Sequence, residues 1–224
     1  MRLLCLFLII TTVLGDSTNI TSELVIKALK NFNQEDFDTL LTNLNGTNWR
    51  NKDQETLLHI ASKEGYFEAA KALIKKDPQL INSTSIDHWF PLHEASWYGK
   101  CDIVSLLLEN GADVNALARY TRETSMYAPS VSALYLSIRA GHTECTKLLL
   151  NKGSRIDHQD HHGWSILHES CRERNYEIVR LLVQMGAKTS IKNEYNETPL
   201  DIAKLYKADE KILHCLEDKN CPNN

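Results

Sequence analysis

Residues 89–108 read WFPLHEASWYGKCDIVSLLL, and versions of this stretch recur along the chain. Four further segments align with it without gaps, at residues 55–74, 131–150, 164–183 and 197–216. One leucine is shared by all five copies, as Leu58, Leu92, Leu134, Leu167 and Leu200. Successive leucines lie about 33 residues apart, a period that indicates a repeat architecture in which each copy is one supersecondary unit. The step from Leu92 to Leu134 is the exception and is longer.

Each copy carries the signals of two helices. In the copy at residues 89–108, Pro91 suits the first turn of a helix, where its missing N–H costs nothing. Gly99 can adopt positive φ and so end that helix. Ile103, Val104 and Leu107 then follow the apolar spacing of one buried helical face. The pattern therefore predicts a short helix, a tight turn and a second, antiparallel helix.

The period and the box PLHEAS at residues 91–96 together resemble the ankyrin repeat family, whose box is TPLHxA, from about residue 51 to residue 216. The resemblance implies an all-α fold, a solenoid of stacked helix-turn-helix units with projecting hairpin loops. It implies an N-terminal helical cap at residues 16–50, about five repeats at residues 51–217 and a tail at residues 218–224. It also implies that the partner is another protein.

The first fifteen residues, MRLLCLFLIITTVLG, carry one positive charge at Arg2 and then an uncharged, mostly apolar run. This pattern predicts a signal peptide at residues 1–15, and hence a chain that is secreted or held in the secretory lumen, without membrane insertion after cleavage. The alternative is an uncleaved or misread segment on a cytoplasmic ankyrin adaptor or inhibitor. In that case Asn115, within LLLENGADVN, resembles the acceptor of an asparaginyl hydroxylase.

Sequons and cysteines fit the secretory interpretation. The sequons predict glycan acceptors at Asn19, Asn45, Asn82 and Asn196. After cleavage five cysteines remain, so at least one cannot pair within the chain. Cys215 and Cys221 are candidates for a disulfide that ties the tail to the last helix. Cys145 and Cys171 align with packing positions and are predicted to be buried, inert thiols.

The longer step between the second and third copies exceeds the common period by about nine residues, which places an insertion at residues 116–131. Insertions in such solenoids map to loops, usually on the binding face. Tyr120, Arg122 and Tyr127 give this segment the composition of a contact loop, because aromatic and Arg side chains dominate binding hot spots. The alternative is a tolerated loop without a role, since long surface insertions cost little.

Aromatic residues of the second repeat extend the predicted partner-binding set. Trp89, Trp97 and Tyr98 are predicted on the concave surface, where clustered aromatics indicate a partner. Alternatively they pack beneath the insertion as a satellite cluster. Arg139 and Trp164 complete the set. Under the first interpretation, replacing Trp97 and Tyr98 with Ala lowers affinity and leaves thermal stability nearly unchanged.

Other classes of function are disfavoured by the sequence. A net charge of -4 and a pI near 6.1, without a basic block, argue against nucleic-acid binding. No catalytic motif is present, so no catalytic residue, cofactor or enzymatic activity is predicted. The tip DHQDHHG at residues 157–163 offers imidazoles and carboxylates, but it is interpreted as a solvated turn and no metal is predicted. The sequence thus predicts a secreted protein-binding module, an effector or inhibitor of its partner.

Overall fold

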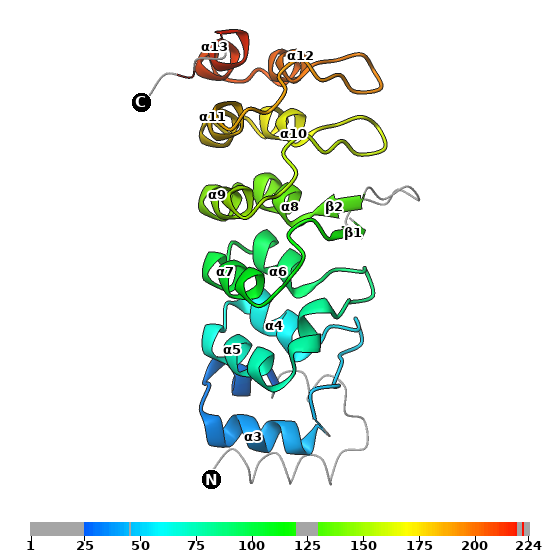
Figure 1. Cartoon of the computed structure of the whole chain (residues 1–224), viewed down its shortest axis with the longest axis vertical. Coiled ribbons are helices and arrows are strands. Elements are labelled where there is room, and N and C mark those ends of the chain that lie inside the picture. Colours follow the sequence, from blue (N-terminus) through cyan, green and yellow to red (C-terminus); the bar gives the residue numbers. More distant parts are fainter. Residues whose placement is uncertain (1–24, 45, 120–129, 219–220, 222–224) are drawn as a thin grey trace.

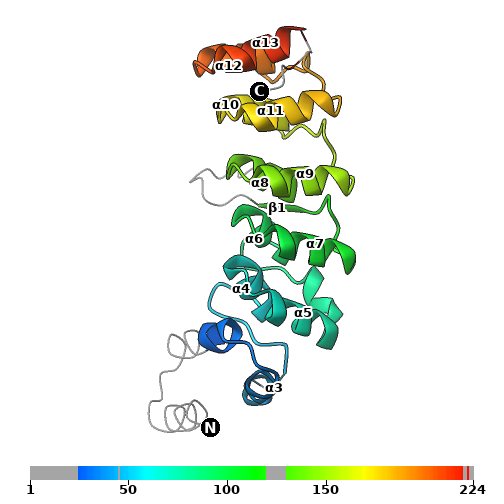
Figure 2. The same cartoon turned by 90° about the vertical axis from the view of Figure 1, so that its left-hand side faces the viewer.

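The computed structural model describes residues 25–44, 46–119, 130–218 and 221. Pairs of antiparallel helices stack in one column, and loops project from the same side of each pair (Figure 1). Figure 2 shows the same column from the side of the outer helices. The inner helices, next to the loops, are α4 (Leu57–Glu64), α6 (Pro91–Trp97), α8 (Ala133–Arg139), α10 (Ile166–Arg172) and α12 (Pro199–Leu205). Their outer partners are α5 (Phe67–Lys76), α7 (Cys101–Glu109), α9 (Thr143–Asn151), α11 (Tyr176–Gln184) and α13 (Glu210–Asp218). The all-α solenoid predicted from the repeat is confirmed.

The start of most inner helices is fixed by a side-chain cap. Thr56, Ser132, Ser165 and Thr198 each accept a hydrogen bond from the backbone N–H three residues further on. Such caps satisfy N–H groups that have no partner inside the helix. In α6 the residue at the N-cap is Phe90, whose side chain cannot accept a hydrogen bond, and Pro91 occupies the first turn.

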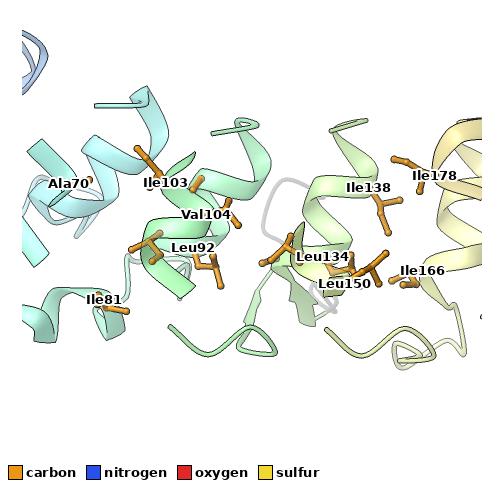
Figure 3. Packing of buried hydrophobic residues seen from close by; sticks show 14 of the residues in the cluster. Ala70, Ile81, Leu92, Ile103, Val104, Leu134, Ile138, Leu150, Ile166 and Ile178 are labelled. Carbon is orange, nitrogen blue, oxygen red and sulfur yellow. The ribbon is translucent and has the colours of Figure 1, made fainter. Parts of the chain in front are cut away.

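One core runs through the stack. Buried apolar side chains of successive repeats follow one another between the helix pairs, among them Leu92, Val104, Leu134 and Ile178 (Figure 3). A single repeat cannot bury its own apolar face, so each contributes one wall of a shared interior. At the N-terminal end, a helix at residues 25–30 and α3 (Gln34–Asn43) add Leu29 to this core, together with Phe37, Leu40 and Leu41.

The insertion between the second and third repeats begins and ends in a short hairpin. Strand β1 (Leu117–Arg119) pairs antiparallel with β2 (Ser130–Ser132), with Ala118 opposite Val131. A separate cluster of buried residues lies at this hairpin, made of Trp89, Ala118, Val131 and Leu136, with Trp97 and Tyr135 packed against it. The hairpin is therefore anchored to the inner helices α6 and α8.

The interface between the second and third repeats, here called the seam, is closely packed and is crosslinked by a disulfide. Cys101, at the start of α7, forms a disulfide with Cys145 in α9. Close by, the ring nitrogen Nε2 of His142 donates to the carbonyl of Trp97 at 3.0 Å. Gly99 has φ +67°, and a Cβ there would lie 2.6 Å from the His142 ring, so this turn requires glycine. Cys145 is thus not the inert thiol that its alignment predicted, because the stacking of α7 on α9 brings Cys101 to it.

Candidate protein-binding surface

One structural position recurs at the C-terminal end of the inner helices. It is occupied in turn by Lys63, Trp97, Arg139, Arg172 and Leu205, which we call the inner row. Trp97 contacts the cluster at the β1–β2 hairpin, and the Arg172 guanidinium lies 5.9 Å from the ring centre of Trp164, in the loop that precedes α10. The inner row therefore lies on the side of the solenoid where helices and projecting loops meet, which is the surface predicted to bind a partner.

A charged cluster occupies the middle of the inner row. The Glu169 carboxylate lies 2.5 Å from Nη2 of Arg172 and 3.5 Å from Nη1 of Arg139, and it also hydrogen-bonds Tyr135. Arg139 in turn donates to the Tyr135 hydroxyl at 2.9 Å. Burial raises the pKa of Glu169 even though both guanidiniums favour its charged form. These bonds hold two arginines of neighbouring repeats over one buried carboxylate.

A small hollow adjoins this cluster. It is lined by side chains of the third and fourth repeats, among them Tyr135, His158 and Trp164. It offers about 20 Å³, close to what a single water molecule requires. Drug-sized ligands occupy clefts of roughly 300 Å³ or more. This hollow therefore suits one group of a larger partner rather than a complete small molecule.

Trp89 was predicted to bind a partner, and the structure corrects that assignment. Its side chain is only 4% exposed and it packs with Ala118, Val131 and Leu136. Its ring also meets the Trp97 ring edge-on, with centroids 6.4 Å apart. The alternative interpretation, a satellite cluster beneath the insertion, describes both residues better. Tyr98 is partly exposed beside the Lys63 ammonium, which lies 5.6 Å from its ring centre.

The two residues Trp97 and Tyr98 should respond differently to truncation. We expect Trp97→Ala to lower the free energy of unfolding by about 2 kcal/mol, roughly half the cost for a fully buried Trp, because Trp97 is partly buried in the cluster. Tyr98→Ala should change it by less than about 1 kcal/mol, as is usual for surface sites. Urea denaturation of the two single variants measures this. Equal losses would contradict the division between packing and surface residues.

Arg139 and Trp164 lie on the predicted face, whereas Tyr120, Arg122 and Tyr127 lie outside the described residues. Sequence reasoning missed Arg172 and Tyr135. A signal was present for Arg172, because it follows Arg139 by one full period of the repeat. Nothing in the sequence indicated that a buried Glu169 would join the two arginines.

The histidines of the repeat box are buried structural groups. In His59, His93 and His168, Nδ1 accepts the backbone N–H three residues before it, and Nε2 donates to a carbonyl of the next loop. Burial lowers the pKa of His59 and of His93 to about 4. Each imidazole is thus neutral and links its repeat to the following one.

The His-rich tip is organised by turn hydrogen bonds. Asp160 accepts the backbone N–H groups of His162 and Trp164, both at 2.9 Å. Asp157 accepts the N–H of Lys188, and His162 pairs with Glu194 at 2.6 Å. Within the described ranges, no three His, Cys, Asp or Glu side chains are grouped so as to hold a metal ion. Asp157 and His162 of the tip instead join the fourth repeat to the fifth, whereas Asp160 stabilises the turn itself.

The described cysteines form two disulfides. Cys215 is bonded to Cys221, the pair that the sequence singled out, and Cys101 is bonded to Cys145. Cys171 is a buried free thiol, and burial raises its pKa, which disfavours the reactive thiolate. Of the sequons, Asn82 and Asn196 are exposed, whereas Asn19 and Asn45 lie outside the described residues. In the part of the chain that is described, no helix has the length and apolarity needed to cross a bilayer.

Comparison with known proteins agrees with this architecture. A family model described as "Ankyrin repeats (3 copies)" matches residues 24–118 and 123–193. Similar proteins include Target of rapamycin complex 2 subunit AVO2 of Saccharomyces cerevisiae, 27% identical over 69% of this chain and 35% of its own length. Human Protein phosphatase 1 regulatory subunit 27 is 30% identical over 40% of this chain and 62% of its own length.

Human Ankyrin repeat and SOCS box protein 3 is 30% identical over 66% of this chain and 34% of its own length. The chain therefore spans between about a third and just under two thirds of these relatives. Two of the three are named as subunits of larger assemblies, which points to protein interaction rather than catalysis. Because the family model covers most of the chain, the protein belongs to the ankyrin repeat family, whose repeats bind other proteins.

Proposed function

We propose that this protein is a secreted, non-catalytic binding module whose inner row and neighbouring loops hold one partner protein, as an effector or inhibitor of it. The observation that carries the proposal is the Cys101–Cys145 disulfide, which joins two neighbouring repeats. Disulfides persist in oxidising compartments and are rare in the cytosol. The second disulfide, Cys215–Cys221, supports the same compartment.

Two further features support secretion. The apolar residues 1–15, which lie outside the described part of the chain, have the composition of a signal peptide. Asn82 and Asn196 are exposed sequons on the folded repeats, and neither belongs to the inner row.

Secretion from a eukaryotic cell tests the compartment. We expect a product in the medium that starts at Asp16, carries glycans at Asn82 or Asn196, and is lighter than its reduced form by the hydrogen atoms lost in two disulfides. Mass spectrometry before and after reduction and enzymatic deglycosylation measures all three. The matched control lacks residues 2–15 and should remain inside the cell. A full-length product retained in the cytosol with an intact N-terminus would overturn the proposal.

The names of the relatives favour a second candidate, an intracellular adaptor or regulatory subunit. Asn115 distinguishes the two. Its side chain accepts the backbone N–H of Arg155 at 2.9 Å and donates to the carbonyl of Gly153 at 3.3 Å, at the loop between the second and third repeats. Hydroxylated Asn115 in protein isolated from its own cells would place the chain in the cytosol and favour this candidate.

A further inference from the structure

Arg139 and Arg172 occupy the same position in consecutive repeats, one full period apart, with the Glu169 carboxylate between them. The exposed fractions of the side chains decide which charge a partner meets. The Glu169 side chain is 3% exposed, whereas those of Arg139 and Arg172 are 21% and 25% exposed. The carboxylate lies beneath the surface and the guanidiniums cover it. At this point of the inner row, the two guanidiniums therefore lie outside the buried carboxylate.

Glu173 is a nearby carboxylate that also reaches the surface. It lies 3.4 Å from Nη2 of Arg172 and is 38% exposed. An ion pair this exposed contributes at most about 1 kcal/mol, because solvent screens it. The buried contact of Arg172 with Glu169 is shorter and better shielded. A second acidic group could therefore displace Glu173 from Arg172 at little cost while the buried pair remains intact.

We propose that Arg139 and Arg172 bind a carboxylate side chain of the partner, an Asp or Glu in an extended segment of polypeptide. The inference rests on the proposed binding function and specifies the chemistry of its partner. Guanidinium groups present several N–H donors in a plane that matches a carboxylate, and charge-assisted bonds of this kind are strong. The aromatic face of Trp164 and the Tyr135 hydroxyl hold the two arginines in place.

Charge balance favours a carboxylate over a phosphate at this position. Glu169 neutralises one of the two guanidiniums, and the exposed Glu173 supplies the second negative charge in the free protein, so a single acid that displaces Glu173 keeps the cluster balanced. A phosphate group carries close to two negative charges at neutral pH and would face the buried carboxylate.

The next repeat indicates that the acid belongs to a polypeptide. Leu205 follows Arg172 by one further period and is 64% exposed, and its neighbour Tyr206 is 44% exposed. Stacked helices lie about 8–10 Å apart, which an extended chain covers in about three residues. A segment that places an acid on the arginines can therefore lay an apolar side chain on Leu205 and Tyr206. A free anion cannot make both contacts.

Selection from a displayed library of random short peptides on the full, disulfide-bonded chain tests the inference. We expect selected peptides to be enriched in Asp or Glu relative to the input library. A fluorescein-labelled selected peptide and its counterpart with Gln or Asn in place of the acid are then compared by anisotropy. The acidic form should bind about tenfold more tightly, as expected for loss of one charge-assisted hydrogen bond.

Two adjacent substitutions should act in opposite directions. Arg172→Gln should weaken binding of the acidic peptide about tenfold and should not change binding of its Gln counterpart. Glu173→Gln removes the competing carboxylate and should strengthen binding about twofold. Glu173→Gln leaves no buried charge unpaired, so it stays informative even if Arg172→Gln does not fold.

The outer helix α11 supplies matched controls. Arg180 and Glu177 form an ion pair of 2.9 Å with similar exposure, 28% and 42%, away from the inner row. Arg180→Gln and Glu177→Gln should each leave peptide affinity unchanged. Circular dichroism melting confirms that every variant is folded.

Several outcomes would overturn the inference. In the selection, these are peptides without acidic enrichment or no selected peptide at all. In the binding measurements, they are equal affinity for the acidic and Gln peptides or tighter binding of a phosphoserine peptide. Among the variants, the contradicting result is an equal effect of Arg172→Gln and Arg180→Gln. Peptides that bind the inner row without an acid would remove the carboxylate preference and leave the proposed binding function standing. An identified protein partner whose binding is insensitive to every inner-row substitution would instead remove the proposed surface.

Discussion

Replacing Cys101 and Cys145 together with Ser is expected to lower the free energy of unfolding by about 4 kcal/mol. The disulfide joins residues separated by 44 positions in the sequence, and the entropy of closing a loop of that length in the unfolded chain gives this value. For a chain of this size, the loss corresponds to a fall of roughly 10 °C in melting temperature. Differential scanning calorimetry of the oxidised protein and the double Ser variant measures it.

The second disulfide provides the comparison. Cys215 and Cys221 are separated by 6 positions in the sequence, so the same reasoning predicts a smaller loss of about 2 kcal/mol for their double Ser variant. Reducing agent should lower the melting temperature of the parent protein to that of a variant without both disulfides. The prediction is contradicted if the double Ser variant of Cys101 and Cys145 loses no more unfolding free energy than that of Cys215 and Cys221. The packing between the second and third repeats would then be stable without the disulfide.

Acidification from about pH 6.5 to about pH 4 is expected to destabilise the protein strongly. His59 and His93 have a folded-state pKa of about 4, below the unfolded value of about 6.5, because burial disfavours the charged imidazole. Between these two values the unfolded chain binds more protons than the folded chain. The stabilisation is therefore fully present above about pH 6.5 and is lost as pH falls to about 4, by about 3 kcal/mol for each histidine.

Urea denaturation at a series of pH values measures this loss, and NMR titration of the ring protons measures the two pKa values directly. A variant with Gln at positions 59 and 93 should be less stable at neutral pH and should show a shallower pH dependence. A titration of His59 and His93 near the ordinary histidine pKa of about 6.5 would contradict the buried, neutral state.

The repeat determined how much of the fold could be predicted. A leucine shared by every copy, helix-capping Ser or Thr and turn glycines such as Gly99 specify each unit locally, so the helix pairs and their stacking followed from the sequence. The nature of the contacts between units could not be derived in this way. Cys101 pairs with Cys145 because α7 packs against α9. No local sequence pattern specifies the distance between these two helices.

The candidate site shows the same division. Arg139 and Trp164 were predicted because their residue types and positions suit binding, and Arg172 could have been found by extending the period. Trp89 was misassigned because its position in a repeat suggests exposure, whereas the hairpin at β1 and β2 covers it. Glutamate is typically a surface residue. Glu169 is buried because two arginines from different repeats, Arg139 and Arg172, pair with its carboxylate and cover it.

The disulfide at the seam also changes the covalent topology of the chain. Residues 101–145 form a closed ring, and the whole insertion at residues 116–131 lies within it. A protease that cuts once inside this ring produces a new pair of ends but not two molecules, since the bond between α7 and α9 still joins both parts. The longest connection between repeats is thus placed where a single cut cannot separate the repeats on its two sides.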